Sequence, residues 1–233
     1  MGVMVKRTSI LGMLFGGETS TEAIKAAIWA ADSNPRVRSI VLVVDSPGGY
    51  TDGLAELGDA VWQARQRGAT KIVAQVEGTA ASAAYYVASQ AHEIWANRLD
   101  MVGSIGTRAS LIDVSKALEA AGVEVLSFDS GPYKSLGVDG VPATEEHKAE
   151  IQRIVDILYA DFLTTVQRGR EMSASALKPL ADGRLFFAKE AKAYGLIDGI
   201  RSLSDTMRKL TSVQRNQNRQ RQAQRLDKKP AML

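Results

Sequence analysis

The sequence predicts an α/β fold with a mainly parallel sheet or repeated ββα units. Two β-branched runs, Ser39–Val44 and Lys71–Val76, contain almost no polar residues, and each is followed by a stretch with helical spacing of apolar residues. Such runs are typical of strands covered on both faces, and their alternation with helices implies right-handed parallel crossovers. With 233 residues, 45% of them hydrophobic, the chain can bury one large core.

The elements follow in order from periodicity and capping signals. The first helix begins at Thr19-Ser20-Thr21-Glu22, which has capping-box spacing, and it ends at Asn34-Pro35. Later helices are predicted from apolar residues that recur with a period of 3.6. They are Leu54–Arg67, Ser82–Ser89, Val114–Ala121, Thr144–Arg170 and the helix–strand segment Ala188–Ile197. Short strands are expected at Glu93–Ala96 and Val123–Phe128, and the apolar patch Ile10–Phe15 is interpreted as the first strand because it is too short for a signal peptide.

The composition restricts the chemistry to Ser, Thr, Lys, Asp, Glu and the backbone. The chain contains no Cys, which excludes disulfides, thiolate nucleophiles and Cys-ligated metals. Two His residues cannot form a three-His metal site, so we expect no metal and no cofactor. The apolar runs are far shorter than the roughly 18 residues of a transmembrane helix, so no membrane anchor is expected.

Basic charge is concentrated at the C-terminal end. Residues 201–233 hold nine Lys or Arg and two acidic residues, a net charge of +7, whereas residues 1–200 hold 20 basic and 24 acidic residues, a net charge of −4. A Gln- and Arg-rich segment with few large apolar side chains cannot offset its ordering entropy. We therefore expect a folded body over residues 1–200 and a largely disordered tail over 201–233, either solvated or docked to nucleic acid or an acidic partner.

Two strand-to-helix junctions carry candidate functional groups. In Ser46-Pro47-Gly48-Gly49, paired glycines can expose backbone N–H groups to a ligand, but alone they are a weak signal, and a plain tight turn explains them as well. The second junction, Glu77–Ala84, consists almost entirely of small residues and contains Ser82. A serine that opens a helix sits where the helix dipole favours developing negative charge, but it can also serve only as a helix cap.

A serine nucleophile needs a base. His92 and His147 are both expected on the surface, which leaves Lys134 in the Gly- and Pro-containing loop 130–135. A lysine acts as a base only in its neutral form, which requires burial or neighbouring positive charge. The residues alone therefore describe Lys134 as a solvated loop lysine.

Together, five segments resemble the signal peptide peptidase A family of serine proteases, whose relatives include tailed-phage prohead proteases. The segments are SIVLVVDSPGG (39–49), VEGTAASAAYYVAS (76–89), HEIWANRLDMVGSIG (92–106), GVEVLSFDSGPYKSLG (122–137) and DGRLFFAKEAKAYGLIDGI (182–200). The resemblance extends from about Ile10 to Ile200, and several ordered motifs at consistent spacing are more specific than any single motif.

The resemblance implies a Ser/Lys dyad on a ClpP/crotonase-like fold of repeated ββα units. Ser82 matches the nucleophile and Lys134 the general base, while the backbone N–H groups of Gly49 and Ala83 match the oxyanion hole. By the same resemblance, Gly48, Gly103 and Ser104 lie where an extended peptide substrate binds. This sequence has Ala83-Ala84 where the family usually has two glycines after the nucleophile, which puts substrate preference and rate in question more than reaction type.

The expected function is that of a serine endopeptidase in phage capsid maturation or scaffold processing, in the host cytoplasm or the procapsid. The expected partners are a peptide or protein substrate, further copies of the chain in a ring that shares its sites, and a scaffold or capsid protein at the basic tail. The alternatives are a soluble bacterial signal-peptide-peptidase-like protease, a crotonase-type enzyme acting on an acyl-CoA, and a catalytically idle ring-forming assembly protein.

Overall fold

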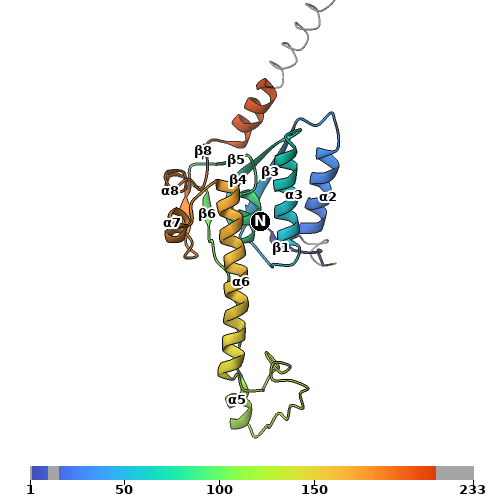
Figure 1. The fold of residues 1–233 in the computed structure, drawn as a ribbon, viewed down its shortest axis with the longest axis vertical. Coiled ribbons are helices and arrows are strands. Elements are labelled where there is room, and N and C mark those ends of the chain that lie inside the picture. The colour runs from blue at the N-terminus through green and yellow to red at the C-terminus, as the bar shows by residue number, and fades with distance from the viewer. Residues whose placement is uncertain (1, 10–15, 214–233) are drawn as a thin grey trace, which may run out of the picture. The chain divides into compact units, whose positions relative to one another are not determined.

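The computed structural model describes residues 2–9 and 16–213, which form two compact units (Figure 1). Unit 1 comprises Met1–Ile105 together with Leu163–Leu233, and unit 2 is Gly106–Phe162. The strand predicted at Ile10–Phe15 lies outside the described residues. Among the described residues, no helix combines the length and the apolar character that a bilayer crossing requires.

Unit 1 contains all the strands and most of the helices of the described residues. Its strands are β1 (Val3–Val5), β2 (Glu18–Ser20), β3 (Ser39–Ser46), β4 (Lys71–Ala81), β5 (Glu93–Ala96), β6 (Met101–Gly103), β7 (Leu185–Phe187) and β8 (Gly199–Ile200). Its helices are α2 (Thr21–Asp32), α3 (Leu54–Arg67), α4 (Ala83–Ala88), the end of α6 (Glu145–Arg170), α7 (Ala174–Leu177), the 3₁₀ turn η1 (Lys178–Leu180) and α8 (Ala188–Ala193). Residues 203–213 are also helical.

The predicted parallel sheet is confirmed, and β4 is its central strand. β4 pairs in parallel with β3 along one side, and with β5 and then β6 along the other. β8 continues the sheet beside β5 in parallel, and β7 pairs antiparallel with β6. Ala80, near the end of β4, lies opposite Ser46 of β3 on one side and Val102 of β6 on the other, so the end of β4 is held between two neighbours.

The prediction that Ser39–Val44 is covered on both faces is wrong. Val43 is 57% exposed, so one face of β3 is not covered at this residue, and β3 pairs only with β4 in the described sheet. By contrast, Ile72–Val76 of β4 is fully buried, as expected. The β-branched run therefore identified a strand correctly but could not distinguish a central strand from an edge strand, because both use the same residue types.

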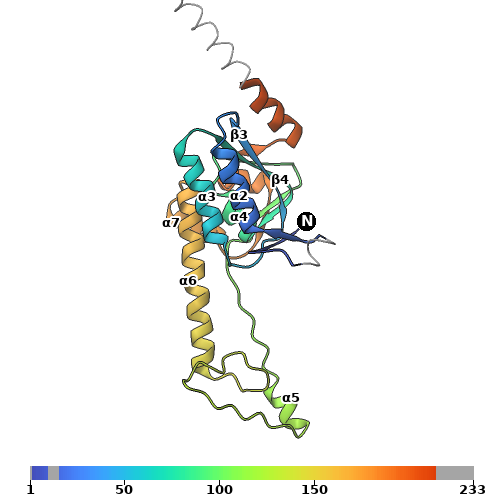
Figure 2. The ribbon, with the colours of Figure 1, turned by 90° about the vertical axis from the view of Figure 1, so that its right-hand side faces the viewer.

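Helices α2 and α3 lie side by side in both views (Figures 1 and 2). The cap of α2 is Ser20, whose Oγ accepts a hydrogen bond from the N–H of Ala23, and not Thr19 as the capping-box spacing predicts. α3 has the predicted bounds, with its apolar face buried. Gly58 on α3 lets it approach α4 closely, since a Cβ there would lie 2.7 Å from the ring of Tyr86.

Unit 2 consists of α5 (Ser115–Ala120), the first part of α6 and the loops that join them. The strand predicted at Val123–Phe128 is wrong, because this segment is non-helical, unpaired and exposed throughout. Phe128 is 93% exposed, so the alternating apolar residues of this segment have no sheet to join within the described chain. The long helix at Thr144–Arg170 is confirmed as α6 to within one residue.

The segment 201–233 does not begin as a disordered tail. Residues 203–213 are helical, and the buried Thr206 hydroxyl donates to Oε1 of Gln75, 2.7 Å away on β4. Gln75 is completely buried, and its amide donates in turn to the carbonyl of Arg201 at 3.1 Å. This polar contact attaches the helix to the sheet, and only residues 214–233, which lie outside the description, remain of the predicted tail.

We predict that Thr206→Val lowers the free energy of unfolding by about 1–3 kcal/mol, because it leaves Oε1 of the buried Gln75 without its donor. The matched control is Thr211→Val on the same helix, whose hydroxyl is exposed and bonds only to the carbonyl of Met207. Urea unfolding of both variants measures the difference, and equal losses would contradict the role of the Gln75 contact.

A second prediction concerns acid stability. Nδ1 of His92 accepts a hydrogen bond from the N–H of Ile72 at 3.0 Å, and burial, with the nearby charge of Arg65 and Lys71, lowers the pKa of His92. The unfolded chain therefore binds a proton at higher pH than the folded chain, so the free energy of unfolding falls as pH drops below about 6.5.

His92→Asn keeps an acceptor near the position of Nδ1 but does not titrate. We expect the variant to lose less stability than the wild type between pH 7.5 and pH 5.5, measured by urea unfolding at both values. An identical loss in the two proteins would rule out His92 as the titrating group.

Candidate active site

Ser82 forms a sharp turn between β4 and α4. Its φ of 50° and ψ of −123° are unusual for a residue with a side chain, and such a conformation costs roughly 1–3 kcal/mol. The N–H of Ser82 donates to the carbonyl of Gly103 at 2.9 Å, and its carbonyl accepts from the N–H of Tyr86 at 2.9 Å. One residue therefore completes the sheet pairing and opens the helix.

The interpretation of Ser82 as a simple helix cap does not hold. Its side chain makes no capping hydrogen bond to α4, and its hydroxyl has no hydrogen-bond partner in the described ranges 2–9 and 16–213. A cap gains its stability from that bond, so the strained backbone here serves no capping function. An unpaired hydroxyl on a strained turn is the arrangement expected of a reactive group.

The Ser-Pro-Gly-Gly turn packs directly against Ser82. Gly48 has a φ of 105°, and a Cβ on it would lie 2.7 Å from Cβ of Ser82 and 3.0 Å from the backbone nitrogen of Ala83. The N–H of Gly48 donates to Oγ of Ser46 at 3.2 Å, and that hydroxyl donates to the carbonyl of Gly2 at 2.6 Å. A glycine is therefore required at position 48 for this turn to approach Ser82 so closely. The turn does more than reverse the chain, because it packs against the candidate nucleophile.

The two predicted oxyanion donors have no acceptor within the part of the chain that the structure describes. Gly49 forms a parallel bridge with Met4, in which Met4 donates to the carbonyl of Gly48 and Tyr50 donates to the carbonyl of Met4. That bridge does not use the N–H of Gly49. Ala83 is the first residue of α4, whose N–H has no partner inside the helix. Their role as a pair remains a prediction.

Gly103 and Ser104 stand next to Ser82 in the sheet. Gly103 lies opposite Ala81 of β4 and opposite Leu185 of β7, so β6 is paired on both sides. The N–H of Ser104 donates to the carbonyl of Arg184 at 2.8 Å, and Ser104 has a φ of 50°. A peptide cannot add as a strand to β6 without displacing β7. Substrate binding at Gly103 and Ser104 therefore stays a prediction, and the peptide would have to bind there in some way other than as an added strand.

Lys134 belongs to unit 2, whereas Ser82 belongs to unit 1. Lys134 is exposed and lies in a turn in which its N–H donates to the carbonyl of Gly131 at 3.1 Å. The pairing of Ser82 with Lys134 is therefore still a prediction.

The histidines are less exposed than the sequence suggested. His92 is half-buried, and His147 is only 4% exposed, so the prediction that both lie on the surface is wrong. Nε2–H of His147 donates to the carbonyl of Pro132, 2.8 Å away. A sequence signal was present, since His147 stands four residues before Ile151, on the apolar stripe of the helix.

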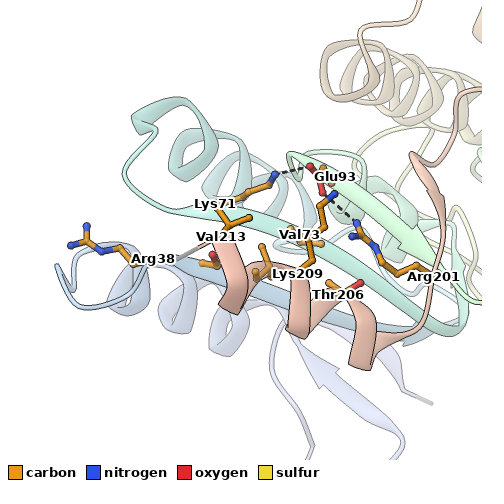
Figure 3. Close-up of a pocket in the computed structure, with 10 residues that line it drawn as sticks. Arg38, Lys71, Val73, Glu93, Arg201, Thr206, Lys209 and Val213 are labelled. Atoms are coloured by element: carbon orange, nitrogen blue, oxygen red, sulfur yellow. Dashed lines mark hydrogen bonds and ion pairs between the residues drawn. The ribbon is translucent and has the colours of Figure 1, made fainter. Parts of the chain in front are cut away.

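A cavity of about 110 Å³ lies in unit 1, at the end of the sheet where β4 begins (Figure 3). It is lined by the first residues of β3 and β4, by Glu93 of β5 and by the helix 203–213. Lys71 forms an ion pair with Glu93 at 2.6 Å inside it. Lys71 begins β4 and Ser82 follows its end, so the cavity and the candidate nucleophile are separated by the length of an 11-residue strand, about 35 Å. The cavity is not part of the candidate active site.

Comparison with known proteins identifies the family. The family model described as "Peptidase family S49" matches residues 64–217, about two thirds of the chain, and includes both Ser82 and Lys134. The chain belongs to peptidase family S49, which has the ClpP-like α/β fold predicted above.

Several similar curated proteins carry protease names. "Putative protease" of Methanocaldococcus jannaschii is 31% identical over 182 residues, which cover 78% of this chain and 58% of that protein. "Putative signal peptide peptidase" of Enterococcus faecium is 32% identical over 171 residues, 73% of this chain and 49% of that protein. "Capsid assembly protease C" of Escherichia phage lambda is 28% identical over 209 residues, 88% of this chain and 46% of that protein. The chain thus spans about half the length of the curated relatives it matches.

We predict that Gly48→Ala reduces labelling of Ser82 by a fluorophosphonate at least about 100-fold, because the new methyl group displaces the serine by a substantial fraction of an ångström. Gly68→Ala is the matched control. Gly68 also has positive φ (66°), but a Cβ there meets nothing within 4 Å, so it carries the backbone strain without the contact. Equal effects of the two substitutions on labelling would contradict the close packing of Gly48 against Ser82.

Proposed function

We propose that the chain is a serine endopeptidase in which Ser82 is the nucleophile and Lys134 the general base. The observation that carries the proposal is the strained, uncapped Ser82, which presents an unpaired hydroxyl beside the Gly48-Gly49 turn. Family membership supports the same reaction class.

The proposed reaction needs only these groups and water. Neutral Lys134 takes the Ser82 proton while Oγ forms a bond to the peptide carbonyl carbon. The N–H groups of Gly49 and Ala83 stabilise the resulting oxyanion. When the C–N bond breaks, the ammonium of Lys134 gives its proton to the leaving amine. Water, deprotonated by Lys134, then attacks the acyl ester, and the proton returns to Oγ of Ser82.

The exposure of Lys134 bears on how the site is completed. A lysine ammonium loses its proton near neutral pH only when it is desolvated or placed beside positive charge. In the described chain Lys134 is exposed. We therefore propose that assembly of several copies buries Lys134 against the Ser82 region, in a ring whose sites are shared between subunits. The exposure of Ile112 (79%), Leu126 (68%) and Phe128 (93%) in unit 2 supports a further chain covering this surface.

For the biological role we propose capsid maturation or scaffold processing in a phage procapsid. The phage lambda relative is named a capsid assembly protease, and the basic residues after 213 suit an acidic scaffold or capsid partner. The rival role is cleavage of signal peptides, after the name of the Enterococcus faecium relative. Incubation with co-expressed scaffold protein and with a synthetic signal peptide distinguishes the two roles by which substrate is cleaved.

We predict that Ser82→Ala and Lys134→Ala each reduce peptide hydrolysis to background without unfolding the protein, since neither side chain has a partner among the described residues. Lys148→Ala, another exposed lysine of unit 2, is the control and retains full activity. Casein hydrolysis, circular dichroism and fluorophosphonate labelling are the measurements.

The same measurements separate the competing classes. Substantial hydrolysis by Lys134→Ala refutes the dyad. Failure of the phosphonate to label Ser82 favours a crotonase-type enzyme, and an intact but inactive wild-type assembly favours an idle structural protein.

A further inference from the structure

The loop that carries Lys134 has a defined internal structure. Within residues 131–138, three backbone N–H groups each donate to the carbonyl three residues earlier, those of Lys134, Leu136 and Val138, at 3.0–3.3 Å. Ser135 is only 7% exposed, whereas Lys134 itself is exposed. The loop therefore consists of tight turns, fixed on one side and presenting the lysine on the other.

His147 attaches this loop to the first turn of α6. Its Nε2–H donates to the carbonyl of Pro132 at 2.8 Å, two residues before Lys134, and its ring lies 6.5 Å from the ring of Tyr133 at an angle of 50°. The backbone N–H of His147 donates to Oγ1 of Thr144, which anchors the start of the helix. Because a carbonyl can only accept, Nε2 carries a proton here, so the bond exists in both the neutral and the protonated imidazole.

Packing alone does not explain a histidine at this position. Position 147 continues the apolar stripe of α6, where a leucine would bury as much surface without the cost of a buried polar ring. Pro132 and Tyr133, which lie against His147, are themselves exposed, so this contact is at the surface of unit 2. What a histidine adds is one directed hydrogen bond to the backbone of the Lys134 loop.

We propose that His147 is a positioning residue for Lys134: it fixes the Pro132 carbonyl and so sets the turn from which the base projects. This inference rests on the proposed function, in which Lys134 takes the proton of Ser82. A general base must lie within hydrogen-bond reach of that proton, and a misplacement of about 1 Å can cost on the order of 100-fold in rate.

Two amide variants test the proposal. His147→Gln places an N–H donor at the position of Nε2, the same number of bonds from the backbone, whereas His147→Asn places its donor one bond short, near the position of Nδ1. We expect His147→Gln to keep kcat within a few-fold of the wild type. We expect His147→Asn to lower kcat about 10- to 100-fold with KM unchanged, because it loses the bond to Pro132 but no substrate contact.

Further measurements separate positioning from folding. The Tm and the assembled size of each variant are determined, and Lys148→Ala, one residue along the same helix and exposed, serves as a control with unchanged kcat. The rate at which a fluorophosphonate labels Ser82 should fall in His147→Asn by the same factor as kcat, since both need the base.

The outcomes are distinct. Wild-type kcat and labelling in His147→Asn, or equal losses in the Asn and Gln variants, would overturn the positioning role while leaving the dyad intact. A wild-type assembly that neither hydrolyses peptides nor is labelled at Ser82 would overturn the proposed function and this inference together.

Discussion

The candidate active site depends on the backbone reversal at Ser82. The N–H of this residue still pairs with β6 through Gly103, while its carbonyl already accepts the first hydrogen bond of α4 from Tyr86. At Ser82 the strand passes into the helix with a left-handed φ of 50°, a conformation that residues with a side chain rarely adopt. The strain is of roughly 1–3 kcal/mol and persists because both neighbouring elements are fixed independently.

The helix after Ser82 is secured by polar contacts as well as by burial. The Tyr85 hydroxyl donates to the carbonyl of Leu196 at 2.8 Å, and burial raises the pKa of Tyr85, so the phenol stays neutral and remains a donor. The Tyr86 hydroxyl accepts from Thr165 at 3.0 Å, and the amide of Gln90 donates to the Thr165 carbonyl at 2.7 Å. These bonds tie α4 to elements more than 70 residues later in the chain, and they hold the turn in place from its C-terminal side.

Much of the fold could be predicted from the sequence, because its helices and central strand carry strong local signals. Apolar periodicity predicts the bounds of α3 and nearly those of α6, and the short strand β5 lies where a strand is expected. The errors in the predicted strands have one physical source. Residue type reports the local preference for a strand, but not which strands or helices will pack beside it. Val43 of β3 is exposed although its β-branched run resembles that of the buried β4, and Val123–Phe128 is irregular and has no partner strand.

In the candidate site, too, the residues that belong to local motifs could be predicted from the sequence, whereas contacts between distant residues could not. The glycines of the Ser-Pro-Gly-Gly turn and the serine after β4 were identified from motifs, and the structure shows that Gly48 and Ser82 are in contact. The contact of His147 with Pro132 joins residues 15 apart through a loop without regular periodicity, so no local pattern specifies it. Nor does local sequence pattern reveal that Thr206, from the segment predicted to be a tail, donates to a buried glutamine in the middle of β4.

The left-handed backbone at position 82 also limits which nucleophiles this scaffold can use. Threonine offers the same hydroxyl chemistry as serine, but its branched Cβ makes a positive φ far more costly. Gly48 also packs closely beside this residue, since a Cβ on that glycine would lie 2.7 Å from Cβ of Ser82. Cysteine is unbranched at Cβ, so the backbone geometry at position 82 tolerates it. This protein can therefore exchange its hydroxyl nucleophile for a thiol more easily than serine for threonine.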